Sequence, residues 1–449
     1  NIRSWGGETE GGNLPSNLYD RIAAIYLQPL RDPEIGLHAG RHSQVSRLID
    51  RLTNEAQRGD FVDIAKDANS KIRELEPVKA AKGVINHQMT SIAGEQLTQK
   101  TELIFSDPTF HRIIAGLIPE IEGLPVALNG LGYNNLVFTS ATLGTLRRSP
   151  QYSLRCILVE EPEAHLHPHL QVLLLRYLAR VTAEEGDDEV QVIASSHSPI
   201  LVSQAPIDSI VSVHEHDGRV AVVSVCSITM EESIKKKLQR FLDATRAELF
   251  FARRLLMVEG IAEVLLLPAL TRIAGGCLKE SAVTVLNADG INFNAFLPLL
   301  GDTRLSFPVA ILTDGDAKKI GDPRSETATS LIEMAKQIPN LCIALSEITL
   351  EHELARSPTI FPMMLDAFEI LHPIKGKELG ENVARLPSAE DKANAFLEMF
   401  RNTKTSKGQF AQELAALLDT SDLESDAVPQ YIKNALGFVG AIGTEALDG

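Results

Sequence analysis

Long apolar runs are missing from this sequence. No stretch approaches the roughly 20 apolar residues that a membrane-spanning helix needs, and the longest candidate, residues 264–270, contains Pro268. The first residues carry no signal-peptide pattern. They also lack an initiator methionine, so we expect that a further segment precedes them in the whole protein. These absences argue against a membrane partner and predict a cytoplasmic protein.

Cysteine is scarce. The chain has 4 cysteines, and no two of them form a C-x-x-C pair. Each lies among apolar residues, which predicts reduced core side chains and excludes a disulfide framework or a cysteine zinc site. The four are Cys156, Cys226, Cys277 and Cys342.

Positive charge is in the minority. The chain has 43 Lys and Arg against 59 Asp and Glu, a formal net charge of −16. This balance excludes a protein coated with basic surface. It leaves DNA open as a partner, because acidic metal sites add negative charge and a local basic patch can still contact phosphates. The length of 449 residues, with 44% hydrophobic and 23% charged residues, indicates a globular chain of two or three domains.

Residues 43–101 repeat apolar side chains at helical spacing between many charges. The pattern predicts an amphipathic helical arm, whose region we extend over about residues 43–125. Two interpretations stay open at this point. The arm is either a helical subdomain that packs on its own domain, or the element through which two copies form a homodimer.

Two regions alternate short β-like runs with helices, which is typical of α/β layering. We predict an ATPase-like α/β domain at residues 1–245 and a parallel-sheet α/β domain with a mainly helical tail at residues 246–449. The expected strands of the first region are 156–159, 190–194, 209–213 and 220–225, with a helix at 169–184. A polar helical linker is expected at 231–251. The expected strands of the second region are 255–258, 283–286, 309–312 and 341–345, with helices at 262–274, near 293–300 and at 325–337.

Two adjacent carboxylates end a strand of the first region. Glu160 and Glu161 follow the run 156–159, and His197 follows the next strand. Open α/β sheets bind their ligands at the carboxyl ends of the strands. We therefore expect Glu160 to hold Mg²⁺, Glu161 to polarise the water that attacks ATP, and His197 to sense the γ-phosphate.

The phosphate-binding loop that would accompany such an ATPase, G-x-x-x-x-G-K-[ST], does not occur in the sequence. Without it, the α- and β-phosphates of ATP lack their backbone cradle. We expect that the chain begins after that loop, and that it hydrolyses ATP poorly until the upstream segment is restored.

Four carboxylates occupy corresponding places in the second region. Glu259 ends a strand and Glu263 follows one helical turn later, while Asp314 and Asp316 follow another strand. Their oxygen ligands favour Mg²⁺ or Mn²⁺ over Zn²⁺. Taken singly, Glu263 is also typical of a first helical turn and residues 314–316 of a turn. Taken together, the four predict a two-metal site for phosphodiester hydrolysis, with Glu259 and Asp314 as essential residues.

These motifs resemble those of a known family. Residues 160–168 resemble the Walker B and D-loop segment of ABC-type ATPases of the DNA-repair and OLD (overcoming lysogenisation defect) kind, and residues 196–199 resemble their switch histidine. Gly130 and Gly132 lie where the nucleotide-capping signature loop of those ATPases lies. The second acidic set resembles the Toprim fold. The OLD family joins such an ATPase to a Toprim nuclease in this order, acts on DNA and is associated with defence against phage.

The resemblance implies further site residues. The segment 349–354 resembles the acidic segment after the third Toprim strand, so Glu351 or Glu353 is implied to complete the metal shell. Lys407, in residues 407–411, resembles the lysine that assists cleavage, and a cation there would offset charge in the transition state. Asp289, in a loop near the second strand, is a further candidate ligand.

The sequence favours an ATP-regulated, metal-dependent DNA endonuclease over two alternatives. A strand-passage enzyme needs a tyrosine nucleophile, and Tyr431 is the single tyrosine of the C-terminal half. An ATP-driven DNA clamp would gain nothing from clustered carboxylates that face phosphates.

Overall fold

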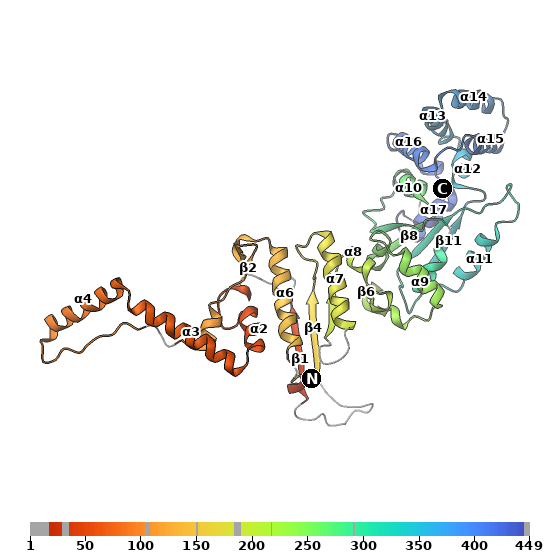
Figure 1. The fold of residues 1–449 in the computed structure, drawn as a ribbon. Helices are drawn as coiled ribbons and strands as arrows, with labels where there is room; N and C mark the ends of the chain where they lie inside the picture. The colour runs from red at the N-terminus through yellow and green to blue at the C-terminus, as the bar shows by residue number, and fades with distance from the viewer. Residues whose placement is uncertain are drawn as a thin grey trace. The chain divides into compact units, whose positions relative to one another are not determined.

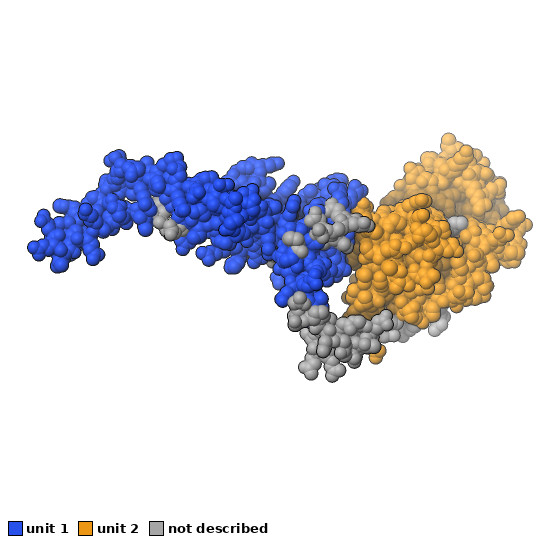
Figure 2. Space-filling view, turned by 60° about the horizontal axis from the view of Figure 1, so that its bottom comes forward, with its two compact units in different colours: residues 1–196 blue, residues 197–449 orange. Residues whose placement is uncertain are grey.

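The computed structural model describes residues 18–28, 36–104, 108–149, 151–183, 190–216, 218–290 and 292–443 (Figure 1). Every site residue predicted above lies within these ranges. The chain divides into two compact units, Asn1–Ser196 and His197–Gly449 (Figure 2). None of the described helices is long and apolar enough to cross a membrane.

The first unit is built on three parallel strands in the order β1-β4-β5. They are β1 (Ile22–Leu27), β4 (Leu154–Glu160) and β5 (Gln191–Ser195). The helices α6 (Leu131–Arg147) and α7 (Pro168–Ala183) bury apolar residues in the same core as β4. The strand, helix and strand expected from residue 156 to residue 194 are therefore confirmed.

The predicted arm is helical. Its helices are α2 (Gln44–Leu52), α3 (Glu55–Arg73), α4 (Glu76–Ala93) and α5 (Phe110–Ala115), followed by the short hairpin β2 (Glu120–Ile121) and β3 (Leu124–Pro125). Asn54 and Gln57 form a capping box that starts α3. Helix α2 packs on α6, whereas α3 and α4 contain no buried residue. Ile64 and Ile92, on these two helices, are 72% and 82% exposed.

The second unit is built on four parallel strands in the order β11-β10-β8-β9. They are β8 (Arg254–Val258), β9 (Val283–Asn287), β10 (Val309–Thr313) and β11 (Leu341–Leu345). Alternate residues of β8 enter two different cores: Leu256 and Val258 one, Leu255 and Met257 the other. Both faces of the sheet are thus covered, as parallel sheets require.

Helices of the tail cover the first of these faces together with α10 (Ile261–Ile273). The closest packing is between α10 and α16. The tail helices are α12 (Leu350–Arg356), α13 (Phe361–Leu371), α14 (Pro373–Val383), α15 (Ala389–Asn402), α16 (Lys407–Asp419) and α17 (Gln430–Phe438). The mainly helical tail after residue 355 is confirmed.

The opposite face is covered largely by residues 197–252, which we had assigned mostly to the first domain. Val223, Leu238 and Phe250 lie in one core with Leu255 and Phe293. The segment consists of α8 (Pro199–Gln204), the antiparallel hairpin β6 (Val211–His216) and β7 (Arg219–Ser224), α9 (Glu232–Phe241) and a 3-10 turn (Arg246–Phe251). The compact units therefore divide after Ser196, about 50 residues before our predicted boundary.

Three further expectations differ from the structure. The helix expected at 231–251 ends at Phe241, and the remainder forms the 3-10 turn. The helix expected near 293–300 is two short 3-10 turns, Asn292–Ala295 and Leu297–Leu299, while α11 (Glu326–Ala335) forms as expected. Cys226 is exposed, although all four cysteines are free.

The shared core of residues 197–252 and the second sheet generates a prediction about fragments. A fragment of residues 246–449 leaves the apolar face of Leu255, Met257 and Phe293 without its cover, whereas a fragment of residues 197–449 keeps it. We expect the longer fragment to unfold cooperatively on heating, monitored by circular dichroism. The shorter one should aggregate or melt at least 10 °C lower, since each uncovered large side chain costs roughly 1.5–3 kcal/mol. Equal melting temperatures would contradict this division of the chain.

Candidate active site

Neighbouring strand ends bring two predicted carboxylates together in the second unit. Strands β8 and β10 pair in parallel, with Val258 opposite Leu312, so Glu259 and Asp314 leave the same edge of the sheet. The backbone N–H of Asp314 donates to Glu259 Oε2 at 3.3 Å. The strand pairing therefore places these two carboxylates side by side.

The Asp314 carboxylate is fixed by the next turn of the chain. Its Oδ1 accepts hydrogen bonds from Ser346 Oγ at 3.1 Å and from the backbone N–H of Leu350 at 2.9 Å. A Cβ at Gly315 would lie 2.3 Å from the Ser346 carbonyl oxygen, so a side chain there would force the two loops apart. Asp314 is thus held by the β11–α12 turn as well as by its own strand.

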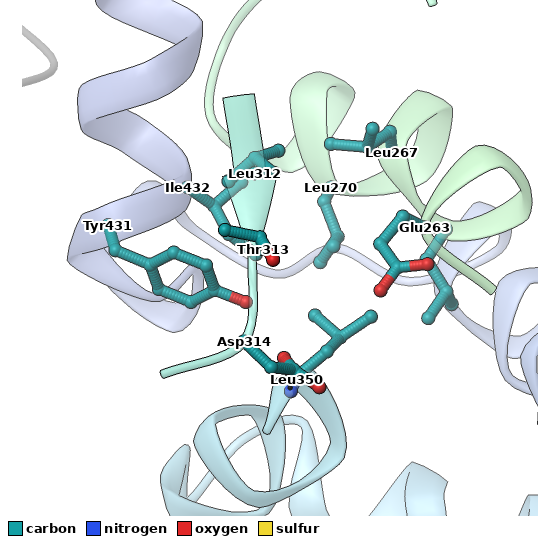
Figure 3. Close-up of a pocket in the computed structure, with 10 residues that line it drawn as sticks. Glu263, Leu267, Leu270, Leu312, Thr313, Asp314, Leu350, Tyr431 and Ile432 are labelled. Carbon is teal, nitrogen blue, oxygen red and sulfur yellow. Dashed lines mark hydrogen bonds between the residues drawn. The ribbon is translucent and has the colours of Figure 1, made fainter. Parts of the chain in front are cut away.

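Glu263 caps its helix and faces the same space. Its Oε2 accepts a hydrogen bond of 3.1 Å from the Gly260 backbone, the arrangement expected of an acid in a first helical turn. It also lines a pocket with Asp314 (Figure 3). Glu263 therefore caps its helix and also lines the candidate site.

Asp316 is placed differently from Asp314. It is exposed, and its φ of 54° lies in the left-handed region. Strand alternation, which would put both acids on one side of the chain, does not continue here, because β10 ends at Thr313 and residues 314–317 are irregular. The two carboxylates nevertheless line one further hollow.

Glu351 carries the ion pair of the site. Its side chain is only 5% exposed, and its Oε1 lies 3.1 Å from Lys407 Nζ. Its Oε2 is buried and accepts no hydrogen bond from the residues that the structure describes. A buried carboxylate oxygen without a donor is costly, which is typical of a group kept for a ligand.

The other two acidic candidates have structural partners. Glu353 Oε1 accepts from the Glu347 backbone at 3.1 Å, and its Oε2 lies 3.3 Å from Arg356 Nη1. The Asp289 side chain is 76% exposed and lies 3.8 Å from Arg246 Nη2. Of the three candidates left open by the sequence, Glu351 is the one that faces Lys407.

Lys407 reaches the site because α16 packs on α10. It begins α16, next to Gly408, where a Cβ would lie 3.1 Å from Ile261 Cγ2. The close approach of the two helices puts the ammonium group against Glu351 although its side chain is 54% exposed overall. An ordinary surface lysine that starts a helix would not contact a buried carboxylate.

The carboxylates perturb one another. Burial raises the pKa of Asp314 to about 8, and the charge of Glu351 adds to the shift while Lys407 opposes it. Burial also raises the pKa values of Glu259 and Glu263. Burial lowers the pKa of Lys407, but the charges of Glu351 and Asp314 outweigh it, so this pKa is raised. One cation thus faces several acids whose negative charge is costly.

The carboxylates of the first unit follow β4. Glu160 Oε2 accepts a hydrogen bond from the Tyr26 hydroxyl of β1, which raises the pKa of Tyr26. Glu161 has a φ of 45°, and its backbone N–H donates to Ser195 at 2.9 Å. The side-chain oxygen Oε1 of Glu163 accepts from Ser196 Oγ at 2.6 Å. The turn after β4 is therefore tied to the end of β5, the edge expected to bind ligands.

The two glycines near the start of α6 have different surroundings. A Cβ at Gly132 would lie 2.6 Å from the His165 carbonyl oxygen, whereas nothing lies within 4 Å of a Cβ at Gly130. Gly132 thus has a packing role against the β4–α7 turn, besides any contact to nucleotide. His197 is the first residue of the second unit, so its role as a phosphate sensor stays a prediction.

Comparison with known protein families finds a match in each half of the chain. Residues 18–202 match the model of an AAA ATPase domain, and residues 250–316 match that of the "Overcoming lysogenization defect protein-like, TOPRIM domain". The chain has the domain pair of the OLD family. The second match contains Glu259, Glu263, Asp314 and Asp316. The resemblance inferred from the motifs is confirmed.

The relatives of this chain include proteins named as nucleases. The chain is 27% identical to an OLD nuclease of Thermus scotoductus over 280 residues, 57% of this chain and 52% of that protein. It is 23% identical to an endonuclease GajA of Bacillus cereus over 417 residues, 79% of this chain and 60% of that protein. The matched part thus spans little more than half the length of these relatives.

Solved structures similar to this chain include C-terminal regions of OLD proteins. The C-terminal region of the Burkholderia pseudomallei OLD protein is 23% identical, with a TM-score of 0.34, over 42% of this chain and 97% of that one. That of Xanthomonas campestris pv. campestris is 26% identical, with a TM-score of 0.32, over 43% and 94% of the two chains.

One residue of this candidate site has more contact with the acids than its sequence indicates. Tyr431, on α17, lines the pocket that contains Glu263 and Asp314, and its ring lies beside Asp314 (Figure 3). Burial and the charge of Asp314 raise its pKa well above the usual value, so the phenol stays protonated at neutral pH. A protonated phenol donates hydrogen bonds but is a poor nucleophile. Because α17 contacts β10 and β11 only through tertiary packing, no local sequence pattern predicts that Tyr431 lies near Asp314.

The donor set suits a hard divalent cation. It consists of carboxylates alone, and Glu351 Oε2 is a buried oxygen without a donor. Within the described part of the chain, however, no three acidic, histidine or cysteine side chains stand close enough to form a ready ligand group. The residue types therefore suit a magnesium or manganese site. Their side chains, however, are spread along the sheet edge.

The raised pKa of Asp314 generates a stability prediction for the metal-free protein. A folded-state pKa near 8 lies above the unfolded value, so ionisation opposes folding increasingly as the pH rises from about 4 to 8. Asp314→Asn keeps an oxygen for Ser346 and Leu350 but removes the charge. In EDTA at pH 8 we expect a melting temperature roughly 2–4 °C higher, about 1 kcal/mol, and a smaller gain at pH 5.

The matched control is Asp302→Asn, which removes the same charge from an exposed loop position. Its melting temperature should not change by more than about 1 °C, as is usual for a surface substitution. A gain from Asp314→Asn that is equal at both pH values, or a loss, would contradict the electrostatic cost.

Proposed function

We propose that this protein is a divalent-metal-dependent DNA endonuclease whose cleavage is regulated by ATP. The observation that carries the proposal is the buried Glu351 carboxylate, which pairs with Lys407 through one oxygen and leaves the other without a donor. Glu259 and Asp314 lie beside it at the edge of the sheet. The nuclease names of the relatives and the match to an OLD-like Toprim domain support the same activity.

The proposed metal ligands are the acids of the sheet edge. Glu259, Asp314 and Glu351 are the central ones, and Glu263 and Asp316 each line a pocket that Asp314 also lines. Glu353 and Asp289 are less suitable, because arginines pair with them. Bound Mg²⁺ or Mn²⁺ would supply charge neutralisation and an activated water.

The chain's own residues have separate roles in this proposal. The hydrogen bonds from Ser346 and Leu350 orient the Asp314 carboxylate before DNA binds. Lys407 is close enough to exchange Glu351 for a phosphate oxygen, and a cation there stabilises the charge that develops during cleavage. The buried floor around Leu312 and Leu350 keeps the site poorly hydrated, which strengthens these charge interactions.

Regulation by ATP is assigned to the first unit. The match to an AAA ATPase domain supports nucleotide binding. We assign Mg²⁺ contact to Glu160, activation of water to Glu161, phosphate sensing to His197, and nucleotide contact to Gly130 and Gly132. A homodimer is also part of the proposal, and the exposed isoleucines of α3 and α4 support it. The OLD resemblance suggests defence against phage as the biological setting.

One observation favours a second candidate, a strand-passage enzyme. Tyr431 lies beside Asp314, where such an enzyme keeps its nucleophile. Its raised pKa argues against attack by the phenolate, so we rank this candidate second. A DNA clamp without catalysis ranks third, because clustered carboxylates repel phosphates unless a cation is present.

The decisive test is plasmid cleavage with Mg²⁺, Mn²⁺ or EDTA. We expect the wild type to nick or cut plasmid with either metal and to be inactive in EDTA, and Asp314→Ala and Glu259→Ala to lose activity at least 10²-fold while keeping their circular dichroism spectra. The reason is that each supplies a ligand that no neighbour replaces. Activity of the wild type in EDTA would refute metal dependence, and a covalent DNA adduct lost in Tyr431→Phe would identify the second candidate.

Lys407 should affect the rate of cleavage more than the affinity for DNA. A cation next to the scissile phosphate acts mainly when charge develops, and it makes a single phosphate contact in the ground state. We expect Lys407→Ala to slow single-turnover cleavage by ~10²-fold, by analogy with the loss of one oxyanion donor, and to weaken binding only several-fold.

The control for this prediction is Lys404→Ala. Lys404 is exposed and precedes α16 by three positions, without the contact to Glu351. It should retain the wild-type rate. Equal losses in rate and affinity for Lys407→Ala would make Lys407 a DNA-binding residue instead.

A further inference from the structure

We infer that the loop between β10 and α11, residues 315–325, together with the hollow beside it, binds the DNA strand next to the phosphate that is cleaved. The inference rests on the proposed function and adds to it a place for the flanking nucleotide. We call these eleven residues the basic loop.

The basic loop is closed at its base. The backbone N–H of Ser325 donates to the Gly315 carbonyl at 3.0 Å, so the first and last residues of the loop meet. The backbone N–H of Asp316 donates to Ile348 at 3.0 Å, and that of Ala317 donates to Glu347 at 3.2 Å. The intervening residues therefore project from a fixed base directly after Asp314.

Three cations of the basic loop have no partner. Lys318, Lys319 and Arg324 are exposed, and none of their side chains forms a hydrogen bond or ion pair with any residue that the structure describes. Some other exposed lysines of the second unit pair with acids, as Lys336 does with Glu333 and Lys375 with Glu378. In a chain of net charge −16, three unpaired cations next to the acidic site favour an anionic ligand.

The hollow beside the loop has the lining of a nucleoside site. Asp314 and Asp316 border it, Phe293 and Leu331 form a buried floor, and the exposed side chains of Asn294 and Thr327 stand at its rim. An apolar floor suits the face of a base or a deoxyribose, and uncharged rim groups offer hydrogen bonds.

The carboxylates, the hollow and the basic loop can take the phosphate, nucleoside and next phosphate that follow one another along a DNA strand. Asp314 borders this hollow as well as the pocket that contains Glu263 and Tyr431. A strand whose phosphate lies at the carboxylates places its next nucleoside at the hollow and its next phosphate near Lys318, Lys319 and Arg324. Phosphate contacts of this kind position the strand without reading its sequence.

The loop is tested by binding of fluorescein-labelled duplex DNA to the full chain in Ca²⁺, measured by fluorescence anisotropy. We expect Lys318→Gln/Lys319→Gln/Arg324→Gln to raise the Kd ~10-fold or more. The slope of log Kd against log salt should fall by about 2–3, because up to three phosphate contacts are lost. The matched control, Lys279→Gln/Lys377→Gln/Arg385→Gln, removes the same charge from exposed positions away from the acidic edge.

The control should change the Kd by no more than about 2-fold and leave the slope unchanged, since distant charges are screened. Equal effects of the two triple variants would mean that only net charge matters and would overturn the inference. Wild-type binding by the loop variant would overturn it as well.

The hollow is tested separately with a fluorescein-labelled single-stranded oligonucleotide. Thr327→Phe fills the rim and should raise the Kd ~5-fold or more. Thr329→Phe, on the same helix but outside the lining, should bind as the wild type does. Equal binding by both variants would remove the hollow from the proposal.

Failure of this inference is distinguishable from failure of the proposed function. If the wild type cleaves plasmid in Mg²⁺ while the loop and hollow variants bind DNA normally, only the inference fails. If the wild type neither binds nor cleaves DNA, the nuclease proposal fails and the inference with it.

Discussion

The contact between Lys407 and Glu351 joins parts of the second unit that are far apart in the chain. Glu351 lies in the first turn of α12, soon after the last strand of the sheet, and Lys407 begins α16 more than fifty residues later. The distance of 3.1 Å between their charged atoms depends on the packing of α16 against α10. That packing in turn depends on the absence of a side chain at Gly408. Without this cation, only hydrogen bonds such as those that Asp314 accepts from Ser346 and Leu350 would offset the repulsion between the carboxylates of the sheet edge. The helical tail is thus a structural requirement of the acidic site as well as a cover for the sheet.

The sequence predicted the parallel strands well because each is short, apolar and followed by a polar turn. Strand 341–345 has the predicted bounds, and the others differ by a few residues at most. The acids at strand ends followed directly, since parallel strands end at a common edge. The OLD resemblance added Glu351 and Lys407, which no local pattern joins to that edge.

Other features could not be predicted from local patterns. The hairpin β6–β7 is a two-stranded sheet of its own, and strand propensity does not tell which domain core such a hairpin packs on. Buried side chains such as Val223 decide that through partners distant in the chain. The left-handed backbone of Asp316 could not be predicted, because the chain after β10 is irregular. Tyr431 entered the site through α17, whose sequence gives no sign of the acids it faces.

The division of the chain after Ser196 splits the motif Ser196-His197-Ser198-Pro199 between two bodies. Ser196 is tied to Glu163 in the turn after β4, whereas Ser198 caps α8, which packs on the 3-10 turn before β8. A single peptide bond therefore separates a group hydrogen-bonded to the carboxylate turn of one unit from the segment that supports the sheet of the other. The chain thus passes from one unit to the other at the bond between Ser196 and His197, with no linker residue between them.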